Sequence, residues 1–286
     1  MSKSKNKVKK NLEIPQVILL TAKILQAISS KLTVLFAAKL FTTPIKHKIP
    51  KREYLMDQNS TQNTVFIPSI QKEIVLYHYG NSTKKVLLVH GWSGRGTQLV
   101  KIADEMLKLG YMTLSFDAPA HGKSKGNSSI MTEFIASILE IDKQYGPFEF
   151  AIGHSLGGMS VLNAIKQNLQ VKKAVIIGSG DIIQDIIDDF IGKLKLKPEY
   201  GVKLKDHFEA KFGGKMNDYS AYKAAEKTEI PVLIVHDKGD DDVSVKAAYH
   251  IQKHLKNSEI MITEGLGHRK ILGDDTVTQK IIEFIK

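Results

Sequence analysis

The chain of 286 residues contains no cysteine. Disulfide bonds, thiolate metal sites and cysteine nucleophiles are therefore excluded. The absence of cysteine suits a reducing compartment such as the cytoplasm. Long apolar runs are lacking too: at the N-terminus the longest uncharged run, residues 14–22, is too short to span a bilayer.

Acidic residues are almost absent from the N-terminal segment. Residues 1–52 hold twelve Lys and Arg but one acid, Glu13, whereas residues 53–286 hold 29 basic and 29 acidic residues. The net charge of +11 therefore lies entirely in the first 52 residues. Because the body is neutral, a diffuse basic face for nucleic acid is not supported, and we expect no nucleic-acid partner.

Residues 1–52 are interpreted as a basic tail, residues 1–11, followed by an amphipathic helix of about seven turns over residues 14–41. Three alternatives stay open for this helix. It packs on the rest of the chain, it lies peripherally on an anionic membrane such as the inner membrane face, or it is a secretory signal without a clean cleavage site. Its apolar arc comprises Val17, Ile18, Ile24, Leu25, Ile28, Leu32, Leu35 and Phe36.

Short apolar runs alternate with helical patterns from residue 64 onward. Continuous Val, Ile and Leu runs are typical of strands that are buried on both faces, and the alternation predicts a mostly parallel sheet with helices on both faces. Residues 53–286 thus form one α/β domain. The predicted strands are 63–68, 72–79, 84–90, 111–117, 147–154, 172–179, 231–237 and 259–265. The predicted helices between and after them are 99–110, 129–146, 155–168, 244–257 and 274–286.

One interval, residues 181–229, contains helical patterns and no strand. An excursion of this length from an alternating fold is usually functional. We interpret it as a helical cap inserted over the carboxyl edge of the sheet. Its apolar side chains, including Ile186 and Phe190, together with Trp92, are candidates for a lipophilic substrate pocket; the alternative is that they only pack the cap.

Ser155 lies in G-H-S-L-G, between a buried strand and an apolar-periodic helix. This G-x-S-x-G pattern is typical of a strained turn that projects a nucleophilic serine above a helix N-terminus, which favours developing negative charge. The alternative is a serine that caps the helix. The nucleophile requires two backbone donors for the oxyanion, which we expect from Leu156 and from Trp92.

A serine nucleophile needs a base, and the base needs an acid. His268, between the last strand and the last helix, is the candidate base. Asp240 is the candidate acid, because it lies just past the end of a strand, where the chain turns. We expect the other acids near residue 240 to have no catalytic role, because Asp237 is too close to the strand and Asp241 and Asp242 face solvent or cap a helix. Among the other histidines, we expect His154 to support the geometry of the serine turn, and His90 and His121 to pack within their loops.

No metal site is expected, because no histidine or loop pattern accompanies the acidic run 240–242.

This set resembles the α/β-hydrolase superfamily over residues 64–286. The resemblance is carried by V-H-G-W, D-x-P-x-H-G-x-S, G-H-S-L-G, H-D-x-x-D-x-x-V and the final G-H; Ala120 and Ser244 replace a glycine and a proline found in many relatives. It implies an α/β-hydrolase fold and a cofactor-free Ser-His-Asp triad that cleaves carboxylic esters or lipid-like acyl substrates. Relatives with an aspartate nucleophile are disfavoured by Ser155.

A thioesterase, a peptidase or a perhydrolase would use the same triad. A membrane-surface binding protein with an idle hydrolase scaffold is the alternative from a different class.

Overall fold

The sheet occupies the centre of the molecule. The computed structural model describes residues 14–286, so the predicted tail at residues 1–11 lies outside the described part. Strand order is β1-β2-β4-β3-β5-β6-β7-β8. β1 and β2 pair antiparallel, as do β2 and β4, and every other neighbouring pair is parallel, so the predicted mostly parallel sheet is confirmed. The strands are β1 (Thr61–Ile67), β2 (Lys72–Tyr79), β3 (Lys85–Val89), β4 (Met112–Asp117), β5 (Phe150–His154), β6 (Lys173–Ile177), β7 (Val232–Asp237) and β8 (Ser258–Thr263).

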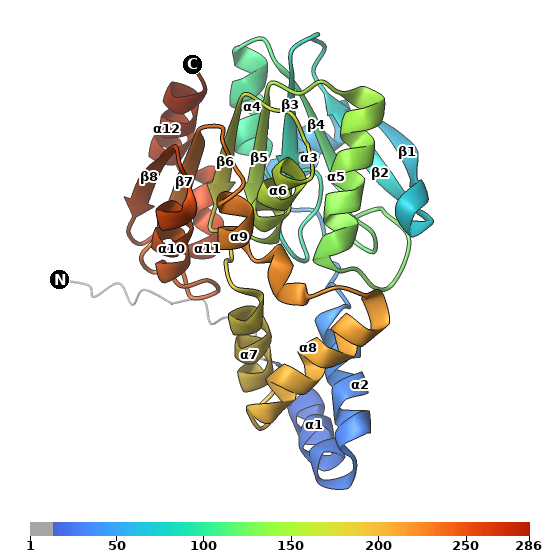
Figure 1. Ribbon diagram of the computed structural model, residues 1–286. Helices are drawn as coiled ribbons and strands as arrows, with labels where there is room; N and C mark the ends of the chain where they lie inside the picture. Colours follow the sequence, from blue (N-terminus) through green and yellow to red (C-terminus); the bar gives the residue numbers. More distant parts are fainter. Residues whose placement is uncertain (1–13) are drawn as a thin grey trace, which may run out of the picture.

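Helices cover both faces of this sheet (Figure 1). Within β3, Val86 and Leu88 belong to one apolar core, and Leu87 and Val89 belong to the other. Both sets are buried because successive strand residues point to opposite faces, which explains the uninterrupted apolar run. α4 (Val100–Lys108) and α12 (Asp275–Ile285) pack on one face, and α5 (Met131–Tyr145), α6 (Leu156–Lys166) and α10 (Lys246–His254) pack on the other.

The predicted helical segment, residues 181–229, lies between β6 and β7. It contains α7 (Ile183–Lys193), α8 (Glu199–Phe212), a 3-10 turn η3 (Met216–Tyr219) and α9 (Ala221–Ala225), with no strand in this described segment. Because β6 ends at Ile177 and α7 begins at Ile183, the segment leaves the sheet at its carboxyl edge. α7 and α8 extend beyond that edge (Figure 1).

The prediction of one continuous helix over residues 14–41 is wrong. The structure has two helices, α1 (Gln16–Ile28) and α2 (Ser30–Phe41), separated by Ser29 with φ −156° and ψ 120°. The Ser29 side chain accepts a hydrogen bond from the backbone N–H of Leu32 and so caps α2. Serine is a preferred N-cap, so this side-chain bond favours a new start over continuation.

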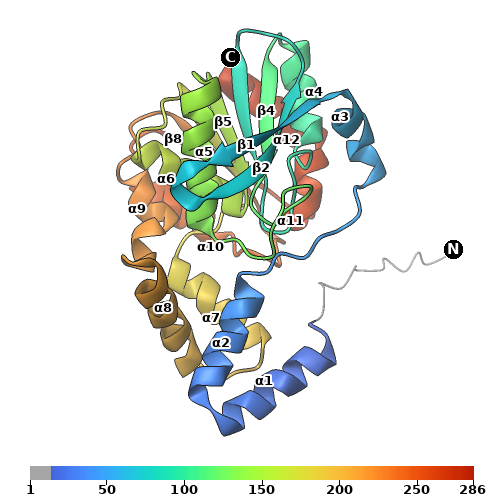
Figure 2. The same cartoon turned by 90° about the vertical axis from the view of Figure 1, so that its right-hand side faces the viewer.

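The two helices form the α1–α2 hairpin, residues 16–41, which packs against the helical segment (Figure 2). The Phe41 ring lies 5.1 Å from that of Phe190 and 5.6 Å from that of Phe208. Gln26 Oε1 accepts a 2.7 Å hydrogen bond from the backbone N–H of Lys197. One side of the hairpin is therefore an intramolecular interface. Across residues 14–286, the structure contains no helix long and apolar enough to cross a membrane.

Five short elements outside residues 181–229 are not predicted from the sequence. They are the 3-10 turns η1 (Lys51–Glu53), η2 (Pro68–Ile70) and η4 (Ile271–Gly273), and the helices α3 (Tyr54–Asn59) and α11 (Gly267–Lys270), the last of which carries His268.

Candidate active site

The polar loops gather where the strand order changes direction. β3 lies between β4 and β5, so the chain leaves β3 toward one side and later returns on its other side. Such a switch point opens a crevice at the carboxyl ends of parallel strands. The loop after β3 and the turn after β5 therefore lie next to each other.

The turn after β5 is tight and strained at Ser155. This residue has φ 54° and ψ −120°, a conformation that non-glycine residues rarely adopt. A Cβ at Gly153 would overlap the backbone of Gly157, and a Cβ at Gly157 would overlap the carbonyl of Val89. The two glycines are needed because the backbones approach too closely for side chains. The Ser155 N–H donates a 2.8 Å bond to the carbonyl of Ile177, which fixes the turn to β6.

Ser155, His268 and Asp240 form a hydrogen-bonded row. His268 Nε2 lies 2.9 Å from Ser155 Oγ, and His268 Nδ1 lies 2.7 Å from Asp240 Oδ2. Because the carboxylate can only accept, Nδ1 carries the proton and Nε2 is left to accept from the serine hydroxyl. The structure thus brings together the three side chains that the sequence analysis selected from three separate loops.

Asp240 is buried and fully supplied with donors. Its side chain is 1% exposed. Its Oδ1 accepts from the N–H groups of Asp242 and Val243 at 2.9 and 2.8 Å. Burial alone would raise the pKa of Asp240, but the hydrogen bond from His268 and those two amides outweigh burial and lower the pKa below its usual range. The carboxylate is therefore held ionised.

His236 adds a contact to Asp240 that the sequence analysis did not identify. Its Nε2 donates to the carbonyl of Val243 at 2.9 Å and lies 3.4 Å from Asp240 Oδ2. The His236 side chain is completely buried, and burial lowers its pKa. The neutral His236 therefore helps to hold the Asp240 carboxylate and the turn that follows it in place.

The neighbouring acids have other partners, as expected. Asp237 Oδ2 accepts from Thr263 Oγ1 at 2.7 Å and from the Leu266 N–H at 3.0 Å, so it links β7 to the loop that carries His268. Asp241 is exposed, and Asp242 lies 3.5 Å from an Arg269 nitrogen. Within residues 14–286, no cluster of three or more metal-ligating side chains is present.

The N–H groups of Trp92 and Leu156, the predicted oxyanion donors, make no hydrogen bond to any residue in the described range 14–286. Leu156 is the first residue of α6, where backbone donors lack an intrahelical partner. The turn that carries Trp92 is braced by Gln98, whose Oε1 accepts from the Gly91 N–H at 2.8 Å. Both N–H groups are therefore unused within residues 14–286, and Gln98 is a support that the sequence did not signal.

His154 joins the serine turn to the loop of the base. Its Nε2 donates to the backbone carbonyl of His268 at 2.9 Å, and the two rings lie 4.7 Å apart. His154 Nδ1 is buried and has no hydrogen-bond partner in the described chain. Burial, reinforced by the nearby His268, lowers the pKa of His154 to about 3. His154 is therefore neutral and connects the Ser155 turn to the His268 loop, which is the supporting role expected for it.

His90 and His121 are buried packing residues. His90 Nε2 accepts from the Ala118 N–H at 3.1 Å, so its Nδ1 carries the proton and donates to the carbonyl of Gly91. The His121 ring lies 5.0 Å from that of His90 and 5.0 Å from that of Trp92. Burial lowers the pKa of both histidines, that of His121 to about 4. Both therefore pack as neutral rings.

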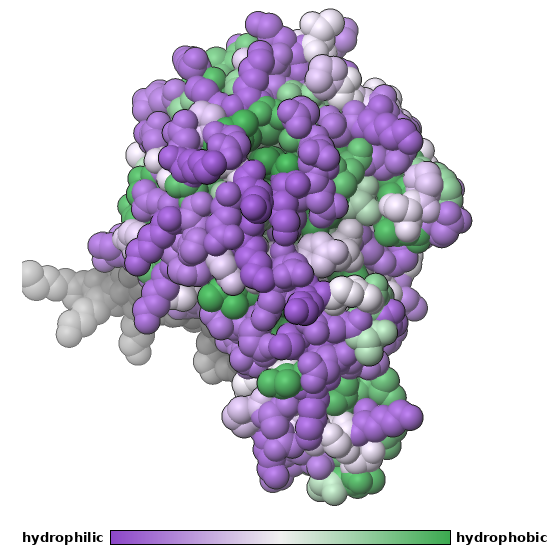
Figure 3. All heavy atoms as spheres, viewed as in Figure 1, coloured by the Kyte–Doolittle hydropathy of each residue, from purple (hydrophilic) through white to green (hydrophobic). Residues whose placement is uncertain are grey.

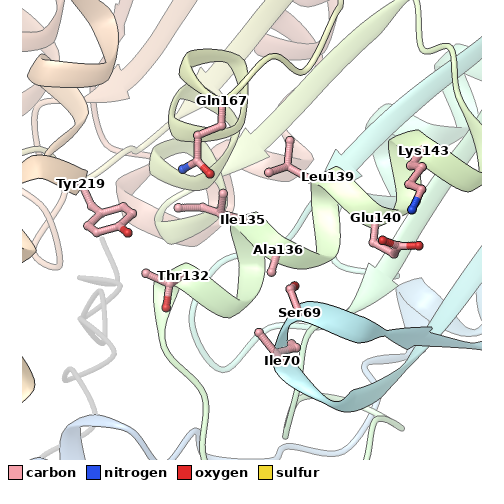
Figure 4. A pocket seen from close by; sticks show the side chains of 10 residues that line it. All are labelled: Ser69, Ile70, Thr132, Ile135, Ala136, Leu139, Glu140, Lys143, Gln167 and Tyr219. Atoms are coloured by element: carbon pink, nitrogen blue, oxygen red, sulfur yellow. The ribbon is translucent and has the colours of Figure 1, made fainter. Parts of the chain in front are cut away.

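The candidate substrate residues are partly buried. The Cδ1 atom of Ile186 lies beside Gly180, close to the edge where Gly178 abuts His268. Phe190 instead packs edge-on against Phe41 of α2. A separate surface pocket of about 450 Å³ lies between α5, the end of η3 and the turn after β1, and is lined by none of Ser155, His268 and Asp240 (Figure 4).

Comparisons with known proteins show what the chain is similar to in sequence. Residues 80–195 match the family model described as serine aminopeptidase, S33, and residues 215–286 match that of TAP-like protein. The chain is 23% identical over 240 residues to a monoglyceride lipase homolog of Monkeypox virus, covering 70% of this chain and 87% of that protein.

Two solved structures show the extent of the likeness in fold. An esterase of Pyrococcus furiosus superposes with a TM-score of 0.65 at 16% identity, over 85% of this chain and 95% of its own. A membrane phospholipase A described as a bacterial virulence factor superposes with a TM-score of 0.60 at 16% identity, over 95% of this chain and 99% of its own. Since residues 53–286 are 234 of 286 residues, or about 82%, the second likeness extends into the N-terminal segment.

Proposed function

The chain belongs to the α/β-hydrolase superfamily, and on that premise we propose that it is a serine hydrolase that cleaves a carboxylic ester or lipid-like acyl substrate. The observation that carries the proposal is the row Ser155–His268–Asp240, with 2.9 and 2.7 Å between successive side chains. Esterases and lipases among the relatives support the substrate class. The reaction needs no cofactor.

Ser155 Oγ attacks the acyl carbonyl while His268 Nε2 takes the hydroxyl proton. Asp240 holds the ring and stabilises the imidazolium that forms. The negative oxygen of the tetrahedral intermediate accepts from the N–H groups of Trp92 and Leu156. Collapse expels the alcohol, which takes the proton from His268, and leaves an acyl group on Ser155. Water, deprotonated by His268, then attacks the acyl carbon; the bond to Ser155 Oγ breaks, His268 returns the proton to that oxygen, and the acid leaves.

The cap, residues 181–229, is proposed to shape the acyl pocket. Ile186 supports this because it lies beside Gly180 at the edge of the site. Phe190 and the Trp92 indole are proposed as further lining. A series of p-nitrophenyl esters of increasing acyl length measures the pocket, and substitution of Ile186 by Trp is expected to shift the preference toward shorter chains. An unchanged preference would remove Ile186 from the pocket.

Labelling with a fluorophosphonate probe tests the nucleophile. The wild-type protein and the Ser160→Ala variant, which loses a buried hydroxyl on α6, are expected to label, whereas Ser155→Ala is not. Equal labelling of Ser155→Ala and wild type would show that another residue reacts. Hydrolysis of short esters that survives in His268→Ala would equally exclude the proposed base.

A peptidase is the second candidate, because the family model over residues 80–195 is described as a serine aminopeptidase. The same triad would then cleave an amide at the N-terminal residue of a peptide. Amino-acid p-nitroanilides separate the two: faster turnover of these amides than of matched acyl esters would favour the peptidase. Failure of both substrate classes would favour an idle scaffold.

We also propose that residues 1–52 make peripheral contact with an anionic membrane, at the cytoplasmic face of the inner membrane. The excess of basic residues supports this, since anionic leaflets attract polybasic segments. The membrane phospholipase A whose fold likeness reaches the N-terminal segment supports it as well.

A further inference from the structure

The outer side of the α1–α2 hairpin is apolar and exposed. Four residues of α1 and two residues of α2 have large exposed fractions, and these six residues are called the exposed stripe. They are Val17 at 68%, Leu20 at 58%, Ile24 at 49%, Ile28 at 70%, Leu32 at 47% and Leu35 at 43%. Figure 3 shows apolar surface at the end of the molecule that α1, α2 and α8 form.

The exposed stripe is a helical face and not a scatter of single side chains. At roughly 3.6 residues per turn, the four positions on α1 fall within an arc of about 80°. The opposite side of α1 carries the buried Ala22 and the bond from Gln26 to the cap. Packing on α2 and the hydrogen bond to the cap therefore explain the inner side of α1 and leave the outer side without a partner within residues 14–286. A helix that is apolar on both sides needs a second apolar environment.

The charges around the exposed stripe indicate which environment that is. Residues 14–52 contain seven basic residues and no acid. Lys23, Lys31 and Lys39 are exposed, and none of them forms an ion pair within the described chain. Apolar side chains flanked by unpaired lysines are typical of helices that lie in the interface of an anionic bilayer. A protein partner or a second copy would not require this excess of one charge.

The length of α1 excludes a transmembrane arrangement for it. Its 13 residues measure about 20 Å, less than the roughly 30 Å apolar core of a bilayer. The hairpin therefore lies along the surface. Phe41 of α2 packs on both α7 and α8. A membrane that binds the hairpin is therefore connected through this packing to the cap, which leaves the sheet beside His268.

We propose that the exposed stripe inserts into the interface of an anionic lipid bilayer, with Lys23 and Lys31 against the lipid headgroups, and that it brings the cap and the Ser155 site to acyl substrates in that surface. The delivery of substrate rests on the proposed hydrolase function. The docking itself does not depend on catalysis.

Sedimentation of full-length protein with vesicles tests the docking. The protein carries Ser155→Ala so that no lipid is consumed. We expect stronger binding to vesicles of phosphatidylcholine with phosphatidylglycerol than to phosphatidylcholine alone. The double variant Leu20→Ser/Ile24→Ser is expected to lose at least about tenfold in partitioning, and Lys23→Gln/Lys31→Gln about fivefold per lysine, only on the anionic vesicles.

The matched control is Leu55→Ser/Phe66→Ser, which removes two apolar side chains, 67% and 47% exposed, outside the hairpin. It should bind like the parent protein. Unchanged binding by Leu20→Ser/Ile24→Ser would overturn the proposal. Light scattering without lipid provides a second criterion: a dimer that dissociates in this variant, with vesicle binding retained, would assign the exposed stripe to a second copy of the chain.

Ester hydrolysis separates the two proposals. With Ser155 intact, Leu20→Ser/Ile24→Ser is expected to hydrolyse a soluble short-chain ester at the wild-type rate. Its turnover of a long-chain ester in anionic vesicles should fall in parallel with binding. Vesicle binding without any ester turnover would leave the docking standing and defeat the hydrolase.

Discussion

The loops at the strand ends bury polar groups, whereas the α1–α2 hairpin exposes apolar ones. The Asp240 side chain is 1% exposed and accepts from His268 and from two amides. Ile28, in the hairpin, is 70% exposed. Neither arrangement is what stability alone favours, because buried charges and exposed apolar faces both cost free energy. The two regions therefore point to two roles: chemistry at the strand ends and docking at the hairpin.

The largest effect is expected from Asp240→Asn. The amide can still accept from the N–H groups of Asp242 and Val243, but it no longer stabilises a charged His268. We expect kcat for a p-nitrophenyl ester to fall by about 10³–10⁴-fold, with little change in the urea midpoint. Asp241→Asn, at an exposed neighbour, should keep the wild-type rate. A loss below about tenfold in Asp240→Asn would mean that the acid of this site is another residue.

The hairpin itself has two sides that a pair of substitutions can distinguish. Phe41→Ala removes the ring held between Phe190 and Phe208 and is expected to cost about 2 kcal/mol of unfolding free energy, since this ring is only partly buried. Leu20→Ser, on the exposed stripe, should stay within about 0.5 kcal/mol of wild type. Urea unfolding in the absence of lipid measures both. Equal losses would show that the exposed stripe contributes to the folded core.

The sequence predicts the sheet better than it predicts the hairpin. Central strands such as β3 and β6 can be predicted because they are buried on both faces and keep an apolar run after their first residue. The break at Ser29 is hidden, because the apolar periodicity continues across it. A cap bond from Ser29 to the Leu32 N–H, of roughly 1 kcal/mol, and the packing of α2 on α8 decide the break, and the second of these is a tertiary contact.

The candidate active site, too, can be predicted only in part from the sequence. Ser155, Asp240 and His268 can be selected from motif and position, because each follows a strand that ends at one edge. Gln98, which braces the Trp92 turn, and His236, behind Asp240, cannot be selected in this way. Their partners are set by how loops approach one another in the fold, and a polar residue type alone does not indicate such a contact.

A smaller effect is expected from the buried His154, read out as a pH dependence. Its pKa is lowered to about 3 in the folded protein, against about 6.5 in an unfolded chain. As pH falls between these values the unfolded state takes up a proton that the folded state does not, so stability declines by about 1.4 kcal/mol per pH unit.

His154→Gln removes that proton and keeps an N–H donor for the carbonyl of His268. Between pH 6 and 5 the variant is expected to lose about 1 kcal/mol less stability than the wild type. Urea unfolding at several pH values measures the difference, which the other buried histidines do not affect because both proteins contain them. Parallel curves would show that His154 is protonated in the folded state.

The smallest effect concerns Ala120, in the loop after β4. Its φ is 64°, in the left-handed region, where a Cβ is unfavourable. The Ala120 N–H donates to the carbonyl of Lys125, so the loop fixes this conformation. Ala120→Gly relieves the backbone strain but gives the unfolded chain more freedom, and we expect a net gain in unfolding free energy of about 0.5 kcal/mol.

The control is Ala118→Gly, at a buried position of the same loop with negative φ. Thermal unfolding compares the two variants, and the control should lose stability. If both glycine variants lose stability, the left-handed conformation of Ala120 does not destabilise the folded protein.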